Sequence, residues 1–115
     1  MKRFVVCGSR HYSDESAVDR ALDAMAVRFP GFVVVHGGAA GADELAGRWA
    51  KKRGHPCEVF VAEWAREGRA AGPLRNQRML DTKPDGVVGL PGGTGTAHMC
   101  RIAEEAGVKV WRPYG

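Results

Sequence analysis

The sequence predicts an α/β fold, a doubly wound three-layer sandwich around a five-stranded, mainly parallel sheet. The first observation behind this prediction is that short apolar runs alternate with segments of helical periodicity along the chain. The second is that these runs are continuously apolar, which is typical of parallel strands buried on both faces. Right-handed crossovers between such strands lead us to expect the strand order 3-2-1-4-5. Ligands bind such sheets where the chain reverses direction, here between strands 1 and 4.

The N-terminal half of the chain is expected to hold two strands and two helices. Residues 4–7 are a short apolar run and form the first strand. The helix that follows is capped at residues 13–15, carries one apolar face and stops at Pro30-Gly31. Residues 32–36 form the second strand. The helix after the turn at 37–43 ends with three cations before Gly54, which suits the negative end of a helix.

The C-terminal half is expected to hold three strands and two helices. Strands are predicted over 56–61, 85–90 and 108–111. A long loop at 63–72 leads to a short helix over 73–80 that begins with proline. The last helix covers 96–106 and ends before Gly107. Residues 1–115 therefore predict a single domain.

Composition narrows the class of protein. Hydrophobic residues make up 44% and charged residues 26% of the chain, as in soluble globular proteins. No apolar run is long enough to cross a bilayer, so we expect no membrane association. The three scattered cysteines argue against a disulfide framework or a zinc site, and indicate small buried residues in a reducing, cytoplasmic environment. The net charge of +4 suits an anionic ligand.

Glycine-rich turns follow three of the predicted strands: GSR at 8–10, HGGAAGAD at 36–43 and LPGGTGT at 90–96. Because strands 1 and 4 flank the chain reversal, these turns are expected to surround a pocket. LPGGTGT suits phosphate, since its glycines admit close approach, a helix N-terminus follows and two threonines add hydroxyl donors. The alternative is a tight turn whose glycines need positive φ, with a threonine as helix cap. A dinucleotide fingerprint is weakened because His98 replaces its third glycine.

Several side chains are candidates for contact with such a ligand. HGGAAGAD lacks the G-K-[ST] of a phosphate-binding P-loop, and Asp43 either accepts a ribose hydroxyl or caps its helix. Arg10, Arg75 and Arg78 are candidate anion partners. The histidines near this edge show no metal-ligand spacing, so no metal site is expected. Trp64 could fold over the pocket from its long loop.

The segments VCGSR, VHGGAAGAD, GPLRNQRML and LPGGTGT, in this order, resemble the SLOG superfamily of Rossmann-like domains. That group includes the LOG phosphoribohydrolases and the Smf/DprA DNA-processing proteins, and the chain is most similar to its YspA-type, cpYpsA-related branch of bacteria and phages. The resemblance covers nearly the whole chain. It implies a Rossmann-like fold and a nucleotide or ADP-ribose-like ligand, with no required cofactor. It also implies a homo-oligomer, and leaves nucleic acid as a less favoured partner.

The turns and the resemblance together give the expected ligand-binding residues: Gly8, Ser9, Arg10, His36, Gly37, Gly38, Gly41, Asp43, Arg75, Asn76, Gly92, Gly93, Thr94, Gly95 and Thr96.

One departure from the LOG enzymes bears on catalysis. Their motif P-G-G-x-G-T-x-x-E ends in a glutamate that serves N-glycosidic cleavage, and this chain has Met99 there. A thioether is neither an acid nor a base, so we expect nucleotide binding or sensing without strong intrinsic catalysis. One alternative is an N-glycosidic hydrolase that uses Asp43, Glu63 or His98. The other is an accessory protein that binds single-stranded DNA.

Overall fold

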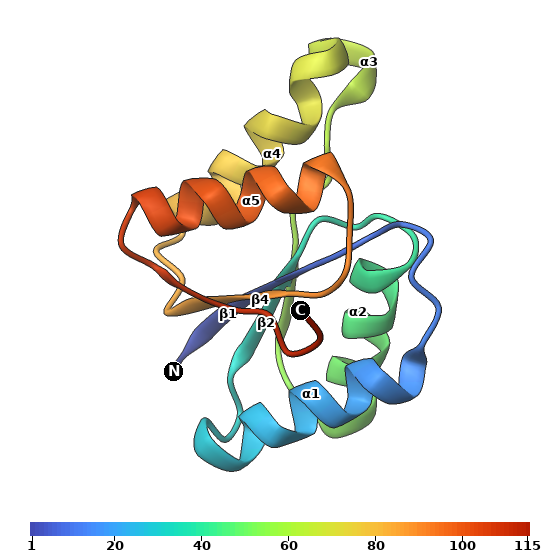
Figure 1. The fold of residues 1–115 in the computed structure, drawn as a ribbon, viewed down its shortest axis with the longest axis vertical. Helices are drawn as coiled ribbons and strands as arrows, with labels where there is room; N and C mark the ends of the chain where they lie inside the picture. Colours follow the sequence, from blue (N-terminus) through green and yellow to red (C-terminus); the bar gives the residue numbers. More distant parts are fainter.

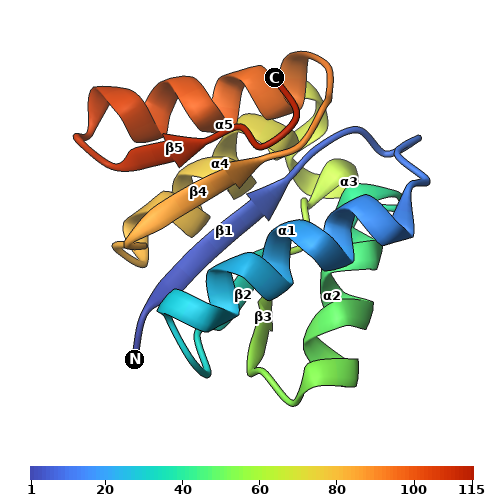
Figure 2. The ribbon, with the colours of Figure 1, turned by 60° about the horizontal axis from the view of Figure 1, so that its bottom comes forward.

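The computed structural model describes residues 1–115 as one five-stranded sheet with helices on both faces (Figure 1, Figure 2). All strand pairs are parallel and the order is β3-β2-β1-β4-β5, which confirms the predicted order. The strands are β1 (Arg3–Cys7), β2 (Val33–His36), β3 (Cys57–Val59), β4 (Gly86–Gly89) and β5 (Lys109–Trp111).

Four main helices cover the two faces of the sheet. The helices α1 (Glu15–Arg28) and α2 (Ala42–Arg53) pack on one face, and α4 (Ala71–Asp81) and α5 (Thr94–Glu105) pack on the other (Figure 1). Successive side chains of β1 alternate between the two layers, so that Phe4 and Val6 join the first core while Val5 and Cys7 join the second. Burial on both faces explains why the strands read as unbroken apolar runs.

The structure corrects two predictions. The segment predicted as a loop over 63–72 contains α3 (Trp64–Glu67) and a 3₁₀ turn, η1 (Gly68–Ala70), and α4 begins at Ala71. Pro73 therefore lies within the first turn of α4, where its missing N–H has no intrahelical partner to lose.

The second correction concerns α5, which begins at Thr94 with Gly93 as its N-cap. Thr96 is thus inside the helix, and no side chain caps the N-terminus. The alternative interpretation, in which a threonine caps this helix, is therefore wrong.

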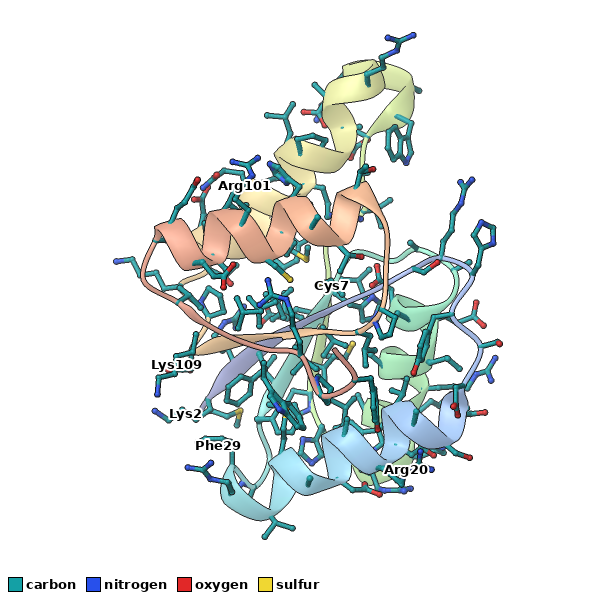
Figure 3. The ribbon with its side chains drawn as sticks, in the orientation of Figure 1. Lys2, Cys7, Arg20, Phe29, Arg101 and Lys109 are labelled. Atoms are coloured by element: carbon teal, nitrogen blue, oxygen red, sulfur yellow. The ribbon has the colours of Figure 1, made fainter.

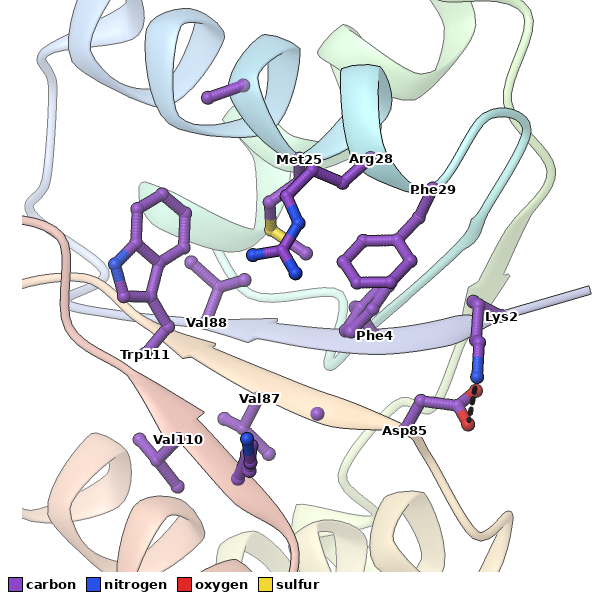
Figure 4. Close-up of a pocket in the computed structure, with 13 residues that line it drawn as sticks. Lys2, Phe4, Met25, Arg28, Phe29, Asp85, Val87, Val88, Val110 and Trp111 are labelled. Atoms are coloured by element: carbon purple, nitrogen blue, oxygen red, sulfur yellow. Dashed lines mark ion pairs between the residues drawn. The ribbon is translucent and has the colours of Figure 1, made fainter.

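A groove remains where no helix covers β4 and β5 on the α1 side of the sheet (Figure 4). It has a volume of about 560 Å³ and an apolar lining that includes Phe4, Phe29 and Trp111. Lys2 and Asp85 form an ion pair of 3.7 Å at its rim. These residues stand mostly at the amino ends of the strands, away from the glycine turns. None of the helices combines the length and apolar character that crossing a membrane requires.

Two glycines that flank α2 share the same φ but differ in ψ, which is −124° at Gly41 and 27° at Gly54, and in packing. Gly41 and Gly54 both have φ of +74°, but only Gly41 is closely packed, since a Cβ there would overlap the main chain of Arg10. Gly54 is in the left-handed helical region and a Cβ there meets nothing within 4 Å.

We predict that Gly41→Ala lowers the free energy of unfolding by about 3 kcal/mol or more, from backbone strain and overlap together. Gly54→Ala should cost about 1–2 kcal/mol, from strain alone. Urea denaturation of both variants measures the difference. Equal losses would mean that neither the ψ of −124° nor the contact with Arg10 makes Gly41 harder to replace than Gly54.

Candidate functional site

Main-chain groups of Ser9 join the three glycine turns. The Ser9 N–H donates to the Pro91 carbonyl oxygen at 2.9 Å. The Ser9 carbonyl oxygen accepts from the Ala42 N–H at 3.1 Å and from the Tyr12 N–H at 3.1 Å. The turn after β1 is thereby tied both to the start of α2 and to LPGGTGT, so the turns meet at the carboxyl edge of the sheet.

A cavity of about 720 Å³ opens beside this junction, within the usual size range of small-ligand pockets. Its charged side chains are three arginines, Arg10, Arg69 and Arg75, against one carboxylate, that of Asp43. The cavity therefore favours an anion.

The structure divides the predicted site residues into two groups. Those that line the cavity are Gly8, Ser9, Arg10, Asp43, Arg75, Asn76, Gly93, Thr94, Gly95, Thr96 and His98. Those outside its lining are His36, Gly37, Gly38, Gly41, Glu63 and Gly92. The second group is mostly structural: the Arg75 and Asp43 side chains fill the space beside Gly37, for example.

Arg75 and Asn76 connect α4 to the other loops. Arg75 Nη1 donates to the Gly37 carbonyl oxygen at 2.7 Å, and its Nε donates to Asn76 Oδ1 at 3.0 Å. Asn76 Nδ2 donates to the Gly95 carbonyl oxygen at 3.2 Å and lies 3.1 Å from His98 Nδ1. Arg75 Nη2 makes no hydrogen bond within the protein, which leaves both of its N–H donors for a ligand.

Asp43 does not cap α2 in the usual way, because the N-cap residue is Gly41. Instead Asp43 Oδ2 accepts from the N–H groups of Gly37 at 3.1 Å and Ala39 at 3.2 Å, which fixes the turn after β2. Burial raises the pKa of the Asp43 carboxyl, and the hydrogen bond from Ala39 and the neighbouring His36 and Arg75 partly oppose that shift. Asp43 Oδ1 accepts no hydrogen bond within the protein, so it is the oxygen left to face a ligand hydroxyl.

The chain buries only three polar or charged side chains, His36, Asp43 and Asn76, and all three lie at this edge of the sheet. Burying polar groups is costly unless they are hydrogen-bonded, and each of these has a partner. Their concentration here makes this edge the functional candidate of the fold.

The three glycines of the LPGGTGT turn differ in how closely they are packed. None of Gly92, Gly93 and Gly95 has positive φ, so the alternative of a tight turn that needs positive φ is wrong. A Cβ at Gly92 would overlap the Thr96 side chain, which explains that glycine. A Cβ at Gly93 or Gly95 would meet nothing within 4 Å, so packing within the protein explains neither of them.

Part of the cavity wall was missed in the sequence. Arg69, Gly72, Pro73 and Met79 also line the cavity. The arginine-rich stretch 66–78 gave a signal of charge, but spacing alone could not separate Arg69, which reaches the cavity, from Arg78, which pairs with Glu67 at 3.4 Å. Trp64 lines the cavity from α3 and remains 61% exposed.

His36 provides a pH test of the junction. Its Nδ1 accepts from the Gly38 N–H at 3.0 Å, so protonation of Nδ1 breaks that bond. Burial lowers the pKa of His36, with Arg75 acting in the same direction and Asp43 opposing. Because the folded pKa lies below the unfolded value of about 6.5, the stability contribution of His36 is complete above that pH. It is lost as pH falls through the folded pKa.

We predict that wild type loses stability between pH 7.5 and 5.5 relative to His36→Asn, by at most about 1.4 kcal/mol per pH unit. An asparagine Oδ1 can replace Nδ1 as acceptor but does not titrate. Urea denaturation at the two pH values gives the comparison. Parallel pH profiles would show that His36 does not couple protonation to folding.

The sequence is similar to one protein family and to a phage protein. The sequence profile of the YspA, cpYpsA-related SLOG family matches residues 2–66. A relative, the Gene 61 protein of Mycobacterium phage D29, is 41% identical in an alignment of 118 positions that spans 96% of this chain and 94% of the relative.

Two solved structures share the fold. TM1055, a structural-genomics target, superposes with a TM-score of 0.74 at 22% identity, over 96% of this chain and 72% of that one. DNA processing protein A (DprA) from Streptococcus pneumoniae gives 0.76 at 19% identity, over 96% of this chain and 49% of that one, so this chain spans about half of DprA. Since the family profile matches more than half of the chain and the phage relative is matched almost end to end, the protein belongs to the YspA, cpYpsA-related SLOG family.

Proposed function

We propose that the protein binds or senses a nucleotide or nucleotide-derived ligand, without strong intrinsic catalysis. A ligand phosphate lies at the N-terminus of α5, and its ribose lies toward Asp43. Family membership and the fold shared with DprA support a nucleotide-related role. The homo-oligomer and the cytoplasmic location expected from the sequence stay predictions.

The observation that carries this proposal is Gly95. It lies in the first turn of α5, where glycine is less favourable than alanine, yet nothing in the protein occupies the space of a Cβ there. The same residue lines the cavity. A ligand that contacts the main chain at Gly95 supplies the reason for glycine that the protein lacks.

The electrostatics of the cavity agree with a phosphate at this place. The N-terminus of α5 has no capping side chain, and the N–H groups of a first helical turn bind anions. Arg75 brings its free Nη2 from the opposite helix, and the Asn76 hydrogen bond to Gly95 holds the two helices in register. The fixed geometry reduces the entropy lost on binding.

The acid–base groups support binding rather than cleavage. Met99, at the position of the LOG glutamate, is fully buried in the core. Glu63 is outside the cavity lining. Asp43 and His98 line the cavity, but hydrogen bonds to the main chain and to Asn76 already position them.

Single-stranded nucleic acid is a second candidate ligand, favoured by one observation. The exposed Trp64 and the charged Arg69 line the same cavity, and an aromatic ring beside arginine can stack a base near a phosphate. Binding of this kind should weaken steeply with salt.

We predict opposite effects of Gly95→Ala on folding and on binding. The free protein should gain up to about 1 kcal/mol of stability from the better helix former. Affinity for the ligand should fall tenfold or more, because the added methyl occupies the ligand's place.

The measurement is thermal shift against nucleoside monophosphates, cyclic nucleotides, ADP-ribose, NAD and oligodeoxynucleotides at two salt concentrations. A ligand at 100 times its Kd adds about 2.7 kcal/mol, or roughly 10 °C in Tm. Undiminished binding by Gly95→Ala would overturn the proposed phosphate position. Release of free base from any nucleotide would favour the hydrolase alternative.

We predict that Arg75→Ala weakens phosphate-dependent binding by about 1.5–3 kcal/mol, or roughly ten- to a hundredfold. Arg78→Ala is the matched control, since it lies one turn further along α4 and pairs with Glu67 outside the cavity. Its affinity should equal that of wild type. Isothermal titration with the ligand found above measures both, and equal affinities of the two variants would remove Arg75 from the site.

A further inference from the structure

Two cysteines meet between the sheet and α5. Cys7 ends β1, and its direct neighbour in the parallel register is Gly89 of β4. Gly89 has no side chain, and Cys100 of α5 fills the space above it, since a Cβ at Gly89 would lie 3.0 Å from Cys100 Sγ. Adjacent strands are about 4.8 Å apart, so the two sulfur atoms occupy neighbouring positions in one buried layer. Figure 3 shows Cys7 in the interior of the molecule, below α5 in that view.

The surroundings of Cys100 favour its thiolate. The Cys7 thiol donates to the Val88 carbonyl oxygen at 3.7 Å. Its interaction with Cys100 and the nearby Arg112 lower the pKa of Cys100 to about 7, against the effects of burial and Glu104. The same interaction raises the pKa of Cys7. The pair therefore consists of one thiol that ionises near neutral pH and one that stays protonated beside it.

Cys100 also has a route to small solutes. It lines a second, smaller cavity of about 290 Å³ on the other side of the LPGGTGT turn, together with Arg101 and Arg112. Arg112 is held there by Glu104 through hydrogen bonds of 3.3 and 3.4 Å. A hydroperoxide is small enough for such a cavity. The negative charge that develops on its leaving oxygen is favoured by the guanidinium groups of Arg101 and Arg112.

We propose that Cys100 is a site of oxidation by hydroperoxides and that Cys7 resolves it, closing a Cys7–Cys100 disulfide beside the LPGGTGT turn. The Cys100 thiolate attacks the terminal oxygen of the hydroperoxide and the O–O bond breaks. The leaving oxygen takes a proton from water, which replaces the one that Cys100 released on ionising, and departs as the alcohol (water, from hydrogen peroxide). Sulfur is oxidised to the sulfenic acid while the peroxide is reduced. The Cys7 sulfur then attacks the sulfenic sulfur, and the hydroxyl leaves as water with the Cys7 proton.

Cys57 is an internal control for this proposal. It is exposed on the edge strand β3, and partial burial and Glu58 raise its pKa. If exposure alone decided reactivity, Cys57 would react first. The proposal requires the reverse order, with Cys100 oxidised first although only 3% of it is exposed.

The experiment treats the reduced full-length protein with one to five equivalents of hydrogen peroxide at pH 7.5, alkylates the remaining thiols and measures intact mass and peptides. Apart from the alkyl group on Cys57, the expected product has lost about 2 Da, contains a crosslinked Cys7–Cys100 peptide, and regains those 2 Da with dithiothreitol. The rate should rise as pH increases through 7.

Two variants separate the steps. Cys7→Ser should stop at the sulfenic acid, a gain of about 16 Da at Cys100 that dimedone traps. Cys100→Ala should give no crosslink and no dimedone adduct at Cys7, and its circular dichroism melt checks that it folds. The proposal is overturned if wild type keeps both thiols alkylatable after treatment, or if Cys57 is oxidised before Cys100. Mass detects the disulfide whether or not a nucleotide binds, so this test is independent of the proposed function.

Discussion

Two main-chain hydrogen bonds of Ser9 hold the candidate site together. A parallel sheet brings the carboxyl ends of its strands to one edge, but it does not fix the loops that follow them. Here the N–H of Ser9 reaches the turn after β4, and its carbonyl oxygen reaches the start of α2. The loops after β1, β2 and β4 thus form one unit, and the positions of Arg10, Asp43 and Gly95 around the cavity depend on that unit.

Within this unit, some side chains hold the loops in place and others face the cavity. The buried polar residues Asp43 and Asn76 hold the turn after β2 and the first turn of α5 in place. Arg75 both holds the loops and faces the cavity, because two of its nitrogens bond the protein while the third is free. Each hydrogen bond that these buried groups make offsets part of the cost of burying them, and together the bonds fix the relative positions of the two loops.

Much of the fold was predictable from the sequence because burial on both faces leaves a clear signal in short apolar strands. The convergence of the glycine turns followed from strand order alone. The roles of individual glycines were not predictable: Gly37 is packed against Arg75 and Gly95 is open, yet both read as glycine in a turn. Nor could spacing reveal that Cys100 lies over Gly89, since that contact depends on how α5 packs on the sheet. The segment 63–72 was misread because its helices are too short to show periodicity.

The wall formed by α3 and η1 differs from the rest of the cavity in how firmly it is held. Neither element contains a buried residue, whereas the opposite wall belongs to α5, whose residues Met99 and Ala103 are fully buried in the core. Displacing α3 and η1 therefore exposes little apolar surface and costs little free energy, while displacing α5 opens the core. Local opening of this one wall therefore requires less free energy than unfolding of the whole chain. A ligand of the proposed kind would therefore enter and leave the cavity past residues 64–70, while the loops opposite stay in place.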